Sequence, residues 1–253
     1  MAREIQIEAT ADQLAAAVAE QLVPALEQAQ RDHGRAALAL TAGSIMERVW
    51  GALAASGAAR ALDWSLVDVF WGDERFVAAG SADRNDVPAD RILFDHAPFA
   101  SATRYPMPAA GGEYGDDLDA AAAGYAATLR GARRPDDNGA VPSFDVVLLG
   151  IGPDGHCCSL FPDHPSSSDE SASIIAVRNS PKPPPLRLSL SFDGLNTANE
   201  IWVVASGAGK ADAAARALGG ADRTEVPSAG AQGRLRTLWL LDSDAASNLP
   251  PEL

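Results

Sequence analysis

Short apolar runs alternate along the chain with helical segments, several of which are rich in alanine. Strands that are separated by helices predict a largely parallel sheet with helices on both of its faces. We therefore expect a single α/β domain over residues 1–253, built on an open, mostly parallel sheet. The expected strands are AALALT (36–41), LVDVFW (66–71), FDVVLLG (144–150), LRLSLSF (186–192), EIWVVAS (200–206) and TLWLLD (237–242).

Helix and loop signals lie between these runs. Thr10 and Gln13 form a capping-box pattern at the start of an Ala- and Leu-rich helix that runs towards Gly34. The segments 132–143 and 162–185 are rich in Pro, Ser, Gly and Asp, which is typical of loops. Within the second, the run PKPPP is expected to be extended, because each proline disfavours helix at the residue before it. Further helices are expected after Gly43 and over 84–94, 116–131 and 210–218.

The composition is typical of a globular protein in a reducing compartment. Hydrophobic residues make up 47% of the 253-residue chain, enough for a large buried core. No apolar run is long enough to cross a membrane, and the first residues lack the layout of an export signal. The two cysteines are adjacent, at Cys157 and Cys158, and are expected to be buried thiols. We expect a soluble, cytoplasmic protein.

The formal net charge of −14 argues against nucleic acid and anionic membranes as partners. An anionic ligand would therefore need positive charge that is concentrated at its site. The only two lysines of this Arg-rich chain, Lys182 and Lys210, fall in the unusual stretches SPKPPP and SGAGK. Their placement indicates a binding site.

A Gly-x-Gly-x-x-Gly pattern, formed by Gly150, Gly152 and Gly155, directly follows an expected strand. In a dinucleotide site such a turn opens a helix, and the pyrophosphate lies at the start of that helix. Here Pro162 interrupts the chain soon afterwards, and Asp154 would repel the pyrophosphate. The pattern therefore predicts another use for the turn, and no nucleotide cofactor is expected.

Four of the expected strands end in polar, glycine-containing sequences. Because the carboxyl ends of parallel strands meet at one edge of a sheet, and ligands bind there, we expect these four ends to form one site. They are TAGS (41–44), WGDER (71–75), GPDGH (152–156) and SGAGK (206–210).

The chemistry of these ends favours a phosphomonoester. TAGS and SGAGK both place small residues before a helix, whose free N–H groups and positive dipole end attract phosphate. SGAGK lacks the spacing of a nucleotide-binding Walker loop, and Ala211 replaces its Mg²⁺-binding hydroxyl. His156 and the two cysteines are consecutive, which is poor geometry for one metal ion, and no zinc or serine-hydrolase motif is present. No metal site is expected.

Together the motifs WGDERFV, Ser81 to Asn85, GIGPDGH with SLFP, SPKPPPLR and SGAGKA resemble those of the 6-phosphogluconolactonase family, over about residues 35 to 242. That family shares its fold with sugar-phosphate isomerases and deaminases. The resemblance implies hydrolysis of the δ-lactone of 6-phosphogluconate in the oxidative pentose phosphate pathway, without a metal. The implied partner is a small sugar-phosphate lactone, and the chain is expected to be a monomer or a small homo-oligomer.

The resemblance also implies roles for individual residues. His156 matches the general base, and Asp154 is the acid that would orient its ring. One departure is Ala42, where the family usually has glycine; another is the Cys157–Cys158 pair, which is expected to change only the packing. Substrate and phosphate binding are implied for Gly43, Ser44, Asp73, Arg75, Lys182, Arg187 and Lys210.

Two other functions remain to be weighed. Isomerase and deaminase relatives carry a glutamate that assists ring opening, and Phe161 stands at its position. This difference favours hydrolysis. Transcription regulators use the same fold to sense sugar phosphates, but the chain shows neither a helix-turn-helix extension nor a basic patch.

Overall fold

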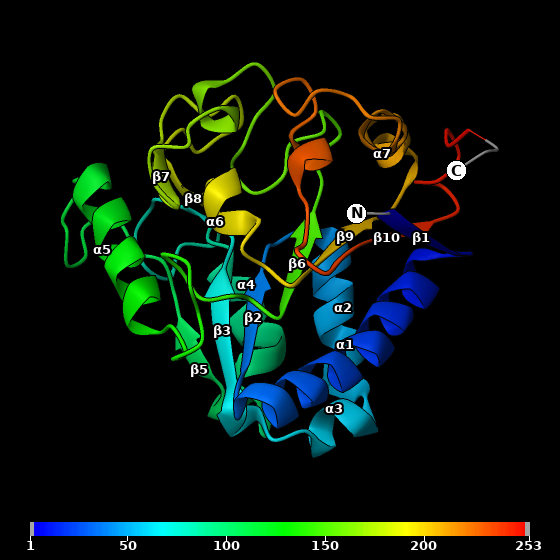
Figure 1. Cartoon of the computed structure of the whole chain (residues 1–253), viewed down its shortest axis with the longest axis horizontal. Coiled ribbons are helices and arrows are strands. Elements are labelled where there is room, and N and C mark those ends of the chain that lie inside the picture. Colours follow the sequence, from blue (N-terminus) through cyan, green and yellow to red (C-terminus); the bar gives the residue numbers. More distant parts are fainter. Residues whose placement is uncertain (1–2, 251–253) are drawn as a thin grey trace.

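Seven strands form one parallel sheet in the order β1-β10-β9-β6-β2-β3-β5 (Figure 1). The computed structural model describes residues 3–250. Every neighbouring pair of strands in this sheet runs parallel, as expected from the alternation of strands and helices. The strands of this sheet are β1 (Arg3–Glu8), β2 (Ala36–Leu40), β3 (Val67–Trp71), β5 (Thr103–Tyr105), β6 (Val146–Gly150), β9 (Glu200–Ala205) and β10 (Arg236–Asp242).

The helices begin and end largely where the sequence predicts. The side chain of Thr10 accepts a hydrogen bond from the Gln13 N–H at the start of α1, and Gly34 ends α1 in a left-handed conformation. A π-helical turn over Asp90–Phe94 continues α4. The α-helices are α1 (Ala11–His33), α2 (Ser44–Ala55), α3 (Gly57–Ala61), α4 (Asp86–Ala89), α5 (Leu118–Gly131), α6 (Phe192–Leu195) and α7 (Ala211–Leu218).

A second, antiparallel sheet has the order β4-β8-β7, with β4 at Asp73–Arg75, β7 at Ile174–Val177 and β8 at Arg187–Leu190. The expectation that LRLSLSF adds a strand to the parallel sheet is therefore wrong. A parallel connection needs a crossover of a dozen or more residues, usually a helix. The proline-rich segment between β7 and β8 is too short for one, so β8 turns back along β7.

The expectation that PKPPP is extended is also wrong. The Ser180 N–H donates to the Pro185 carbonyl oxygen at 3.0 Å, so the segment closes on itself. Prolines cannot donate hydrogen bonds, and their carbonyl oxygens need other donors. The Arg187 side chain supplies them: its Nε donates to Pro184 and its Nη2 donates to Pro183.

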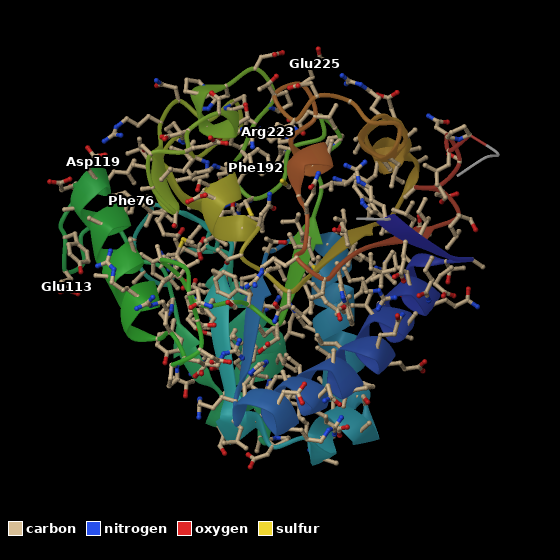
Figure 2. All side chains as sticks on the ribbon, in the orientation of Figure 1. Phe76, Glu113, Asp119, Phe192, Arg223 and Glu225 are labelled. Carbon is tan, nitrogen blue, oxygen red and sulfur yellow. The ribbon has the colours of Figure 1, made fainter. Side chains whose placement is uncertain are left out.

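Helices lie on both sides of the main sheet. In Figure 1, α1 and α2 lie below the strands, whereas α6 and α7 lie above them. The strands of the centre, such as β2 and β3, are buried along their whole length. The acidic side chains of Glu113, Asp119 and Glu225 lie exposed on the outer surface (Figure 2). Among residues 3–250, no helix combines the length and the apolar character that a membrane span requires.

The four strands with polar ends, β9, β6, β2 and β3, are consecutive neighbours in the sheet. Their carboxyl ends therefore lie side by side, as predicted. The ends of β2 and β6 are joined directly, because the Thr41 hydroxyl donates to the Leu148 carbonyl and accepts from the Gly150 N–H. The sheet thus gathers the four polar loops at one edge.

Candidate active site

A pocket of about 360 Å³ opens at this edge. All four polar strand ends contribute to its walls, and so does the loop over 180–185. Asp154 is the one predicted site residue that does not line it; its carboxylate contacts His156 Nδ1 instead. The predicted residues that line it are Gly43, Ser44, Asp73, Arg75, His156, Lys182, Arg187 and Lys210.

His156 stands on a tight turn that follows β6. The Gly152 N–H donates to the His156 carbonyl at 2.8 Å, and the Gly155 N–H donates to the Gly152 carbonyl at 3.0 Å. A Cβ on Gly152 would lie 1.9 Å from the His156 Nδ1, and Gly155 has a φ of +86°. These two glycines are therefore required by the close approach of the imidazole and by the left-handed turn. The glycine pattern builds a histidine site rather than a dinucleotide site.

Asp154 and His156 form a hydrogen-bonded pair. Asp154 Oδ1 lies 2.6 Å from His156 Nδ1. This contact fixes the ring and leaves Nε2 as the nitrogen that can accept a proton, provided that Nδ1 carries the hydrogen. Burial alone would raise the pKa of Asp154, but the hydrogen bonds and charges of His156 and Lys182 outweigh it and hold the pKa well below its ordinary value.

One aromatic ring packs close to the imidazole. The ring of Phe161, which is fully buried, lies 4.9 Å from the ring of His156, centroid to centroid. Cys157 and Cys158 are buried free thiols, as predicted. Burial raises the pKa of both, so neither is an activated nucleophile.

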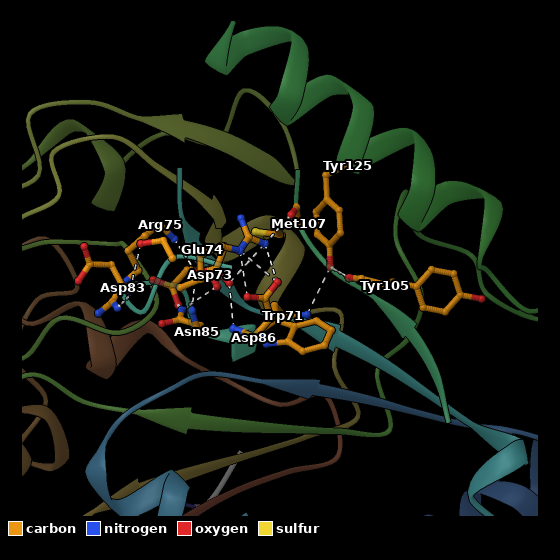
Figure 3. Close-up of polar contacts among 12 residues, drawn as sticks. Trp71, Asp73, Glu74, Arg75, Asp83, Asn85, Asp86, Tyr105, Met107 and Tyr125 are labelled. Carbon is orange, nitrogen blue, oxygen red and sulfur yellow. Dashed lines mark hydrogen bonds and ion pairs between the residues drawn. The ribbon is translucent and has the colours of Figure 1, made fainter. Parts of the chain in front are cut away.

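The WGDER segment is fixed by a buried polar network beneath the pocket (Figure 3). Asp73 accepts from the Ser159 hydroxyl at 2.7 Å and from the Asn85 side-chain amide at 3.1 Å. Glu74 accepts from the backbone N–H groups of Asn85 and Asp86. Ser159 follows the His156 turn in sequence, so this network holds two walls of the pocket in a fixed relation.

Arg75 and Arg187 are direct partners across β4 and β8. Like charges in directly opposed positions of an antiparallel pair are destabilising, unless an anion lies nearby. Burial lowers the pKa of Arg187; Asp73 opposes this shift and Arg75 adds to it. Both arginines line the pocket, and an anionic ligand there would relieve their repulsion.

Another part of the wall is formed by the first turn of α2 and by the loop before α7. Gly43 precedes α2 with a φ of 145°, and no side chain caps the helix, so its free N–H groups face the pocket with the positive end of the dipole. The left-handed φ falls on Gly43 and not on Ala42, which explains why alanine is tolerated at 42. Lys210 donates from Nζ to the Ile151 carbonyl at 2.7 Å.

Sequence reasoning missed two residues that shape the site. Asn85 lines the pocket and is 2% exposed; it belongs to the motif Ser81 to Asn85, but the sequence predicts no role for it. Asp242, at the end of β10, accepts from the Gly207 N–H at 2.9 Å and from the Ser206 hydroxyl, and so fixes the SGAGK loop. The signal that identified the other loops, a polar residue at a strand's carboxyl end, also applies to Asp242.

Among residues 3–250, no group of three or more His, Cys, Asp or Glu side chains is placed to hold a metal ion. The polar groups that converge on the pocket are mainly cationic side chains, helix N–H groups and one imidazole; the Asp73 carboxylate also lines it but already accepts from Ser159 and Asn85. Such a set suits an anionic, hydroxylated ligand better than a cation.

Comparison with known proteins agrees with this chemistry. The family model for glucosamine-6-phosphate isomerases/6-phosphogluconolactonase matches residues 9–239. A 6-phosphogluconolactonase of Streptomyces coelicolor is 47% identical over 240 residues, which cover 95% of this chain and 92% of the relative. One of Mycobacterium tuberculosis is 44% identical over 250 residues, covering 99% and 100%. The solved 6-phosphogluconolactonase of Trypanosoma brucei has a TM-score of 0.83 at 27% identity, covering 98% and 99%.

Proposed function

Because this chain belongs to the glucosamine-6-phosphate isomerase/6-phosphogluconolactonase family, we propose that it hydrolyses 6-phospho-D-glucono-1,5-lactone to 6-phosphogluconate. The reaction belongs to the oxidative pentose phosphate pathway. The observation that carries the proposal is the Asp154–His156 pair in a pocket that is lined by Arg75, Arg187 and Lys210.

In the proposed mechanism, His156 Nε2 takes a proton from a water molecule that attacks the lactone carbonyl carbon. The carbonyl oxygen becomes an oxyanion, and its collapse breaks the bond to the ring oxygen. The imidazolium then returns the proton to that oxygen, which becomes the hydroxyl of 6-phosphogluconate. Asp154 holds the ring and stabilises the imidazolium. A lactone is an activated ester, so no covalent nucleophile is required.

The environment of His156 favours hydrolysis over the isomerase chemistry of other family members. The resemblance places a ring-opening glutamate of those members at the position of Phe161. Here that position is apolar, fully buried and packed on the imidazole. The side chain cannot transfer a proton, which leaves His156 to act on water.

Phosphate binding is proposed for the wall formed by the start of α2 and by Lys210. Gly43 and Ser44 offer backbone N–H groups at the start of α2, and Lys210 offers an ammonium close by. The arginines then lie towards the lactone ring and the developing oxyanion. Because the protein as a whole is strongly acidic, these local donors must supply the attraction for a dianionic substrate.

Kinetic assay of the purified protein tests the proposal. The lactone is prepared immediately before use, because it hydrolyses spontaneously, and acid release is followed in a weakly buffered indicator solution. We expect a rate that is proportional to enzyme concentration and well above the rate without enzyme. A rate equal to the spontaneous one would refute the proposed function.

A further inference from the structure

The Lys182 ammonium contacts the Asp154–His156 pair at Nδ1 of the imidazole, and not at Nε2, the nitrogen that is proposed to accept the proton. Its Nζ lies 3.0 Å from Asp154 Oδ1 and 3.0 Å from His156 Nδ1. Since Oδ1 and Nδ1 are themselves 2.6 Å apart, the three polar atoms form a closed triangle. Lys182 comes from the proline-rich loop, which is remote in sequence from the other two.

A single arrangement of protons cannot satisfy all three contacts. If His156 Nδ1 carries a hydrogen, it donates to Asp154, and the Lys182 ammonium can then donate only to the carboxylate. If the ammonium donates to Nδ1 instead, the hydrogen of the neutral ring lies on Nε2, which can then no longer accept one from water. Lys182 therefore competes with His156 for Asp154 in the first arrangement and inactivates the base in the second.

The charge of Lys182 acts in the same direction as its hydrogen bonds. An ammonium next to the imidazole opposes formation of the imidazolium, and it also screens the carboxylate that would stabilise the imidazolium. Both effects make Nε2 a weaker base. The Asp154 carboxylate therefore stabilises the His156 imidazolium fully only when the ammonium has moved away.

The loop allows such a movement of the side chain. The Lys182 carbonyl accepts from the Ser180 hydroxyl at 2.8 Å and from Arg187 Nη2 at 3.0 Å, so its backbone is fixed. The Lys182 side chain is 37% exposed and lines the same pocket as Lys210. The four-carbon stem can therefore turn the ammonium towards an anion in the pocket without a change in the loop.

We propose that Lys182 is a positioning residue that makes water activation depend on an anionic substrate, an inference that rests on the proposed function. In the free protein the ammonium occupies the Asp154–His156 pair and weakens the base. When the phosphate of the substrate enters the pocket, Lys182 turns to it, and Asp154 then acts on His156 alone. Unphosphorylated lactones bind without releasing the base.

Lys182→Met tests this dependence, because it removes the charge and retains the apolar stem. On unphosphorylated gluconolactone we expect kcat/KM to rise about three- to tenfold, as a stronger base implies. On the phosphorylated lactone we expect a higher KM with little change in kcat. Two matched variants should show no such gain on gluconolactone: Lys182→Arg, which keeps the charge, and Arg31→Met, which removes an exposed charge on α1 that does not line the pocket.

Equal losses of the Lys182→Met variant on both lactones would overturn the proposal, and so would an equal gain on gluconolactone in the Arg31→Met control. A second measurement needs no variant: inorganic phosphate should stimulate hydrolysis of gluconolactone by the wild-type protein, after the rate without enzyme is subtracted. Absence of stimulation overturns the proposal even if the variant fails to fold. Failure of the proposed function is distinguishable, because the wild-type protein would then not hydrolyse the phosphorylated lactone.

Discussion

The ammonium of Lys210 donates a hydrogen bond to the main-chain carbonyl of Ile151, and so joins the start of α7 to the segment that leads from β6 to His156. Burial lowers the pKa of Lys210, and the charge of Lys182 lowers it further. Two ammonium groups in one pocket repel each other, and an anion between them relieves this repulsion. The phosphate of the substrate fits this requirement.

Replacement of Lys210 by Met should therefore weaken binding of the phosphorylated lactone. A lost charge-assisted hydrogen bond corresponds to about 1.5–3 kcal/mol, so we expect KM to rise about ten- to a hundredfold. The loss on unphosphorylated gluconolactone should be much smaller. Kinetics of both proteins on both lactones isolate the phosphate contribution, in the manner of a mutant cycle. Equal losses on the two lactones would assign Lys210 to folding or to the lactone ring instead.

Replacement of His156 by Ala should lower kcat about a hundred- to ten-thousandfold, the usual range for a positioned acid–base group. The fold should survive, because the imidazole lies in the open pocket and not in the core. Thermal unfolding of the variant checks this point. A folded variant that retains near wild-type turnover would show that another group activates the water.

Treatment with a chelator should leave the activity unchanged. The residues that line the pocket include no set of ligands suited to a divalent ion. The assay compares initial rates before and after incubation with excess EDTA and removal of the chelate by gel filtration. Loss of activity that one divalent ion restores would contradict the mechanism given above.

The five inner strands of the main sheet could be predicted from the sequence because their signals are local, whereas the edge strands β1 and β5, which are partly exposed, are not buried apolar runs and were missed. Each central strand is a short apolar run bounded by turn residues, as in LVDVFW before Gly72. Parallel pairing then brings the four polar strand ends together without further information. The Asp154–His156 contact is equally local, since both side chains stand on one glycine-containing turn.

The second sheet and its contacts could not be predicted in this way. The strand β8 pairs with Asp73–Arg75, a partner that is remote in sequence and too short to show a periodic pattern. The same pairing sets Arg75 opposite Arg187 and brings the loop of Lys182 to Asp154. These contacts depend on the packing of whole elements, and no spacing of residues encodes them.

Glu74 lies under the site in the network of Figure 3 and is 1% exposed. Burial raises its pKa to about 7, even though Arg84 and two backbone N–H groups oppose the shift. Arg84 lies 3.7 Å from Glu74 but forms a closer ion pair of 2.6 Å with Asp86. The charge of Arg84 is therefore shared, and it compensates Glu74 only in part.

This raised pKa predicts how stability depends on pH. Between about pH 4.5 and about pH 7 the folded protein keeps a proton on Glu74, whereas the unfolded chain has already released it. The contribution of Glu74 to the free energy of unfolding is thus largest below this window and is lost as pH rises through it. A shift of this size corresponds to on the order of 3 kcal/mol.

Glu74→Gln removes this titration, so the stability of the variant relative to wild type should improve as pH rises across the window. The amide still offers one oxygen to the N–H groups of Arg75 and Asn85, which share Oε1 in the wild type. Its NH₂ group faces the Asp86 N–H at every pH and lowers stability by a constant amount. Urea unfolding, followed by tryptophan fluorescence at several pH values, measures the difference. The exposed control Glu113→Gln should run parallel to wild type, and a pH-independent difference for Glu74→Gln would mean that the buried carboxylate stays charged throughout.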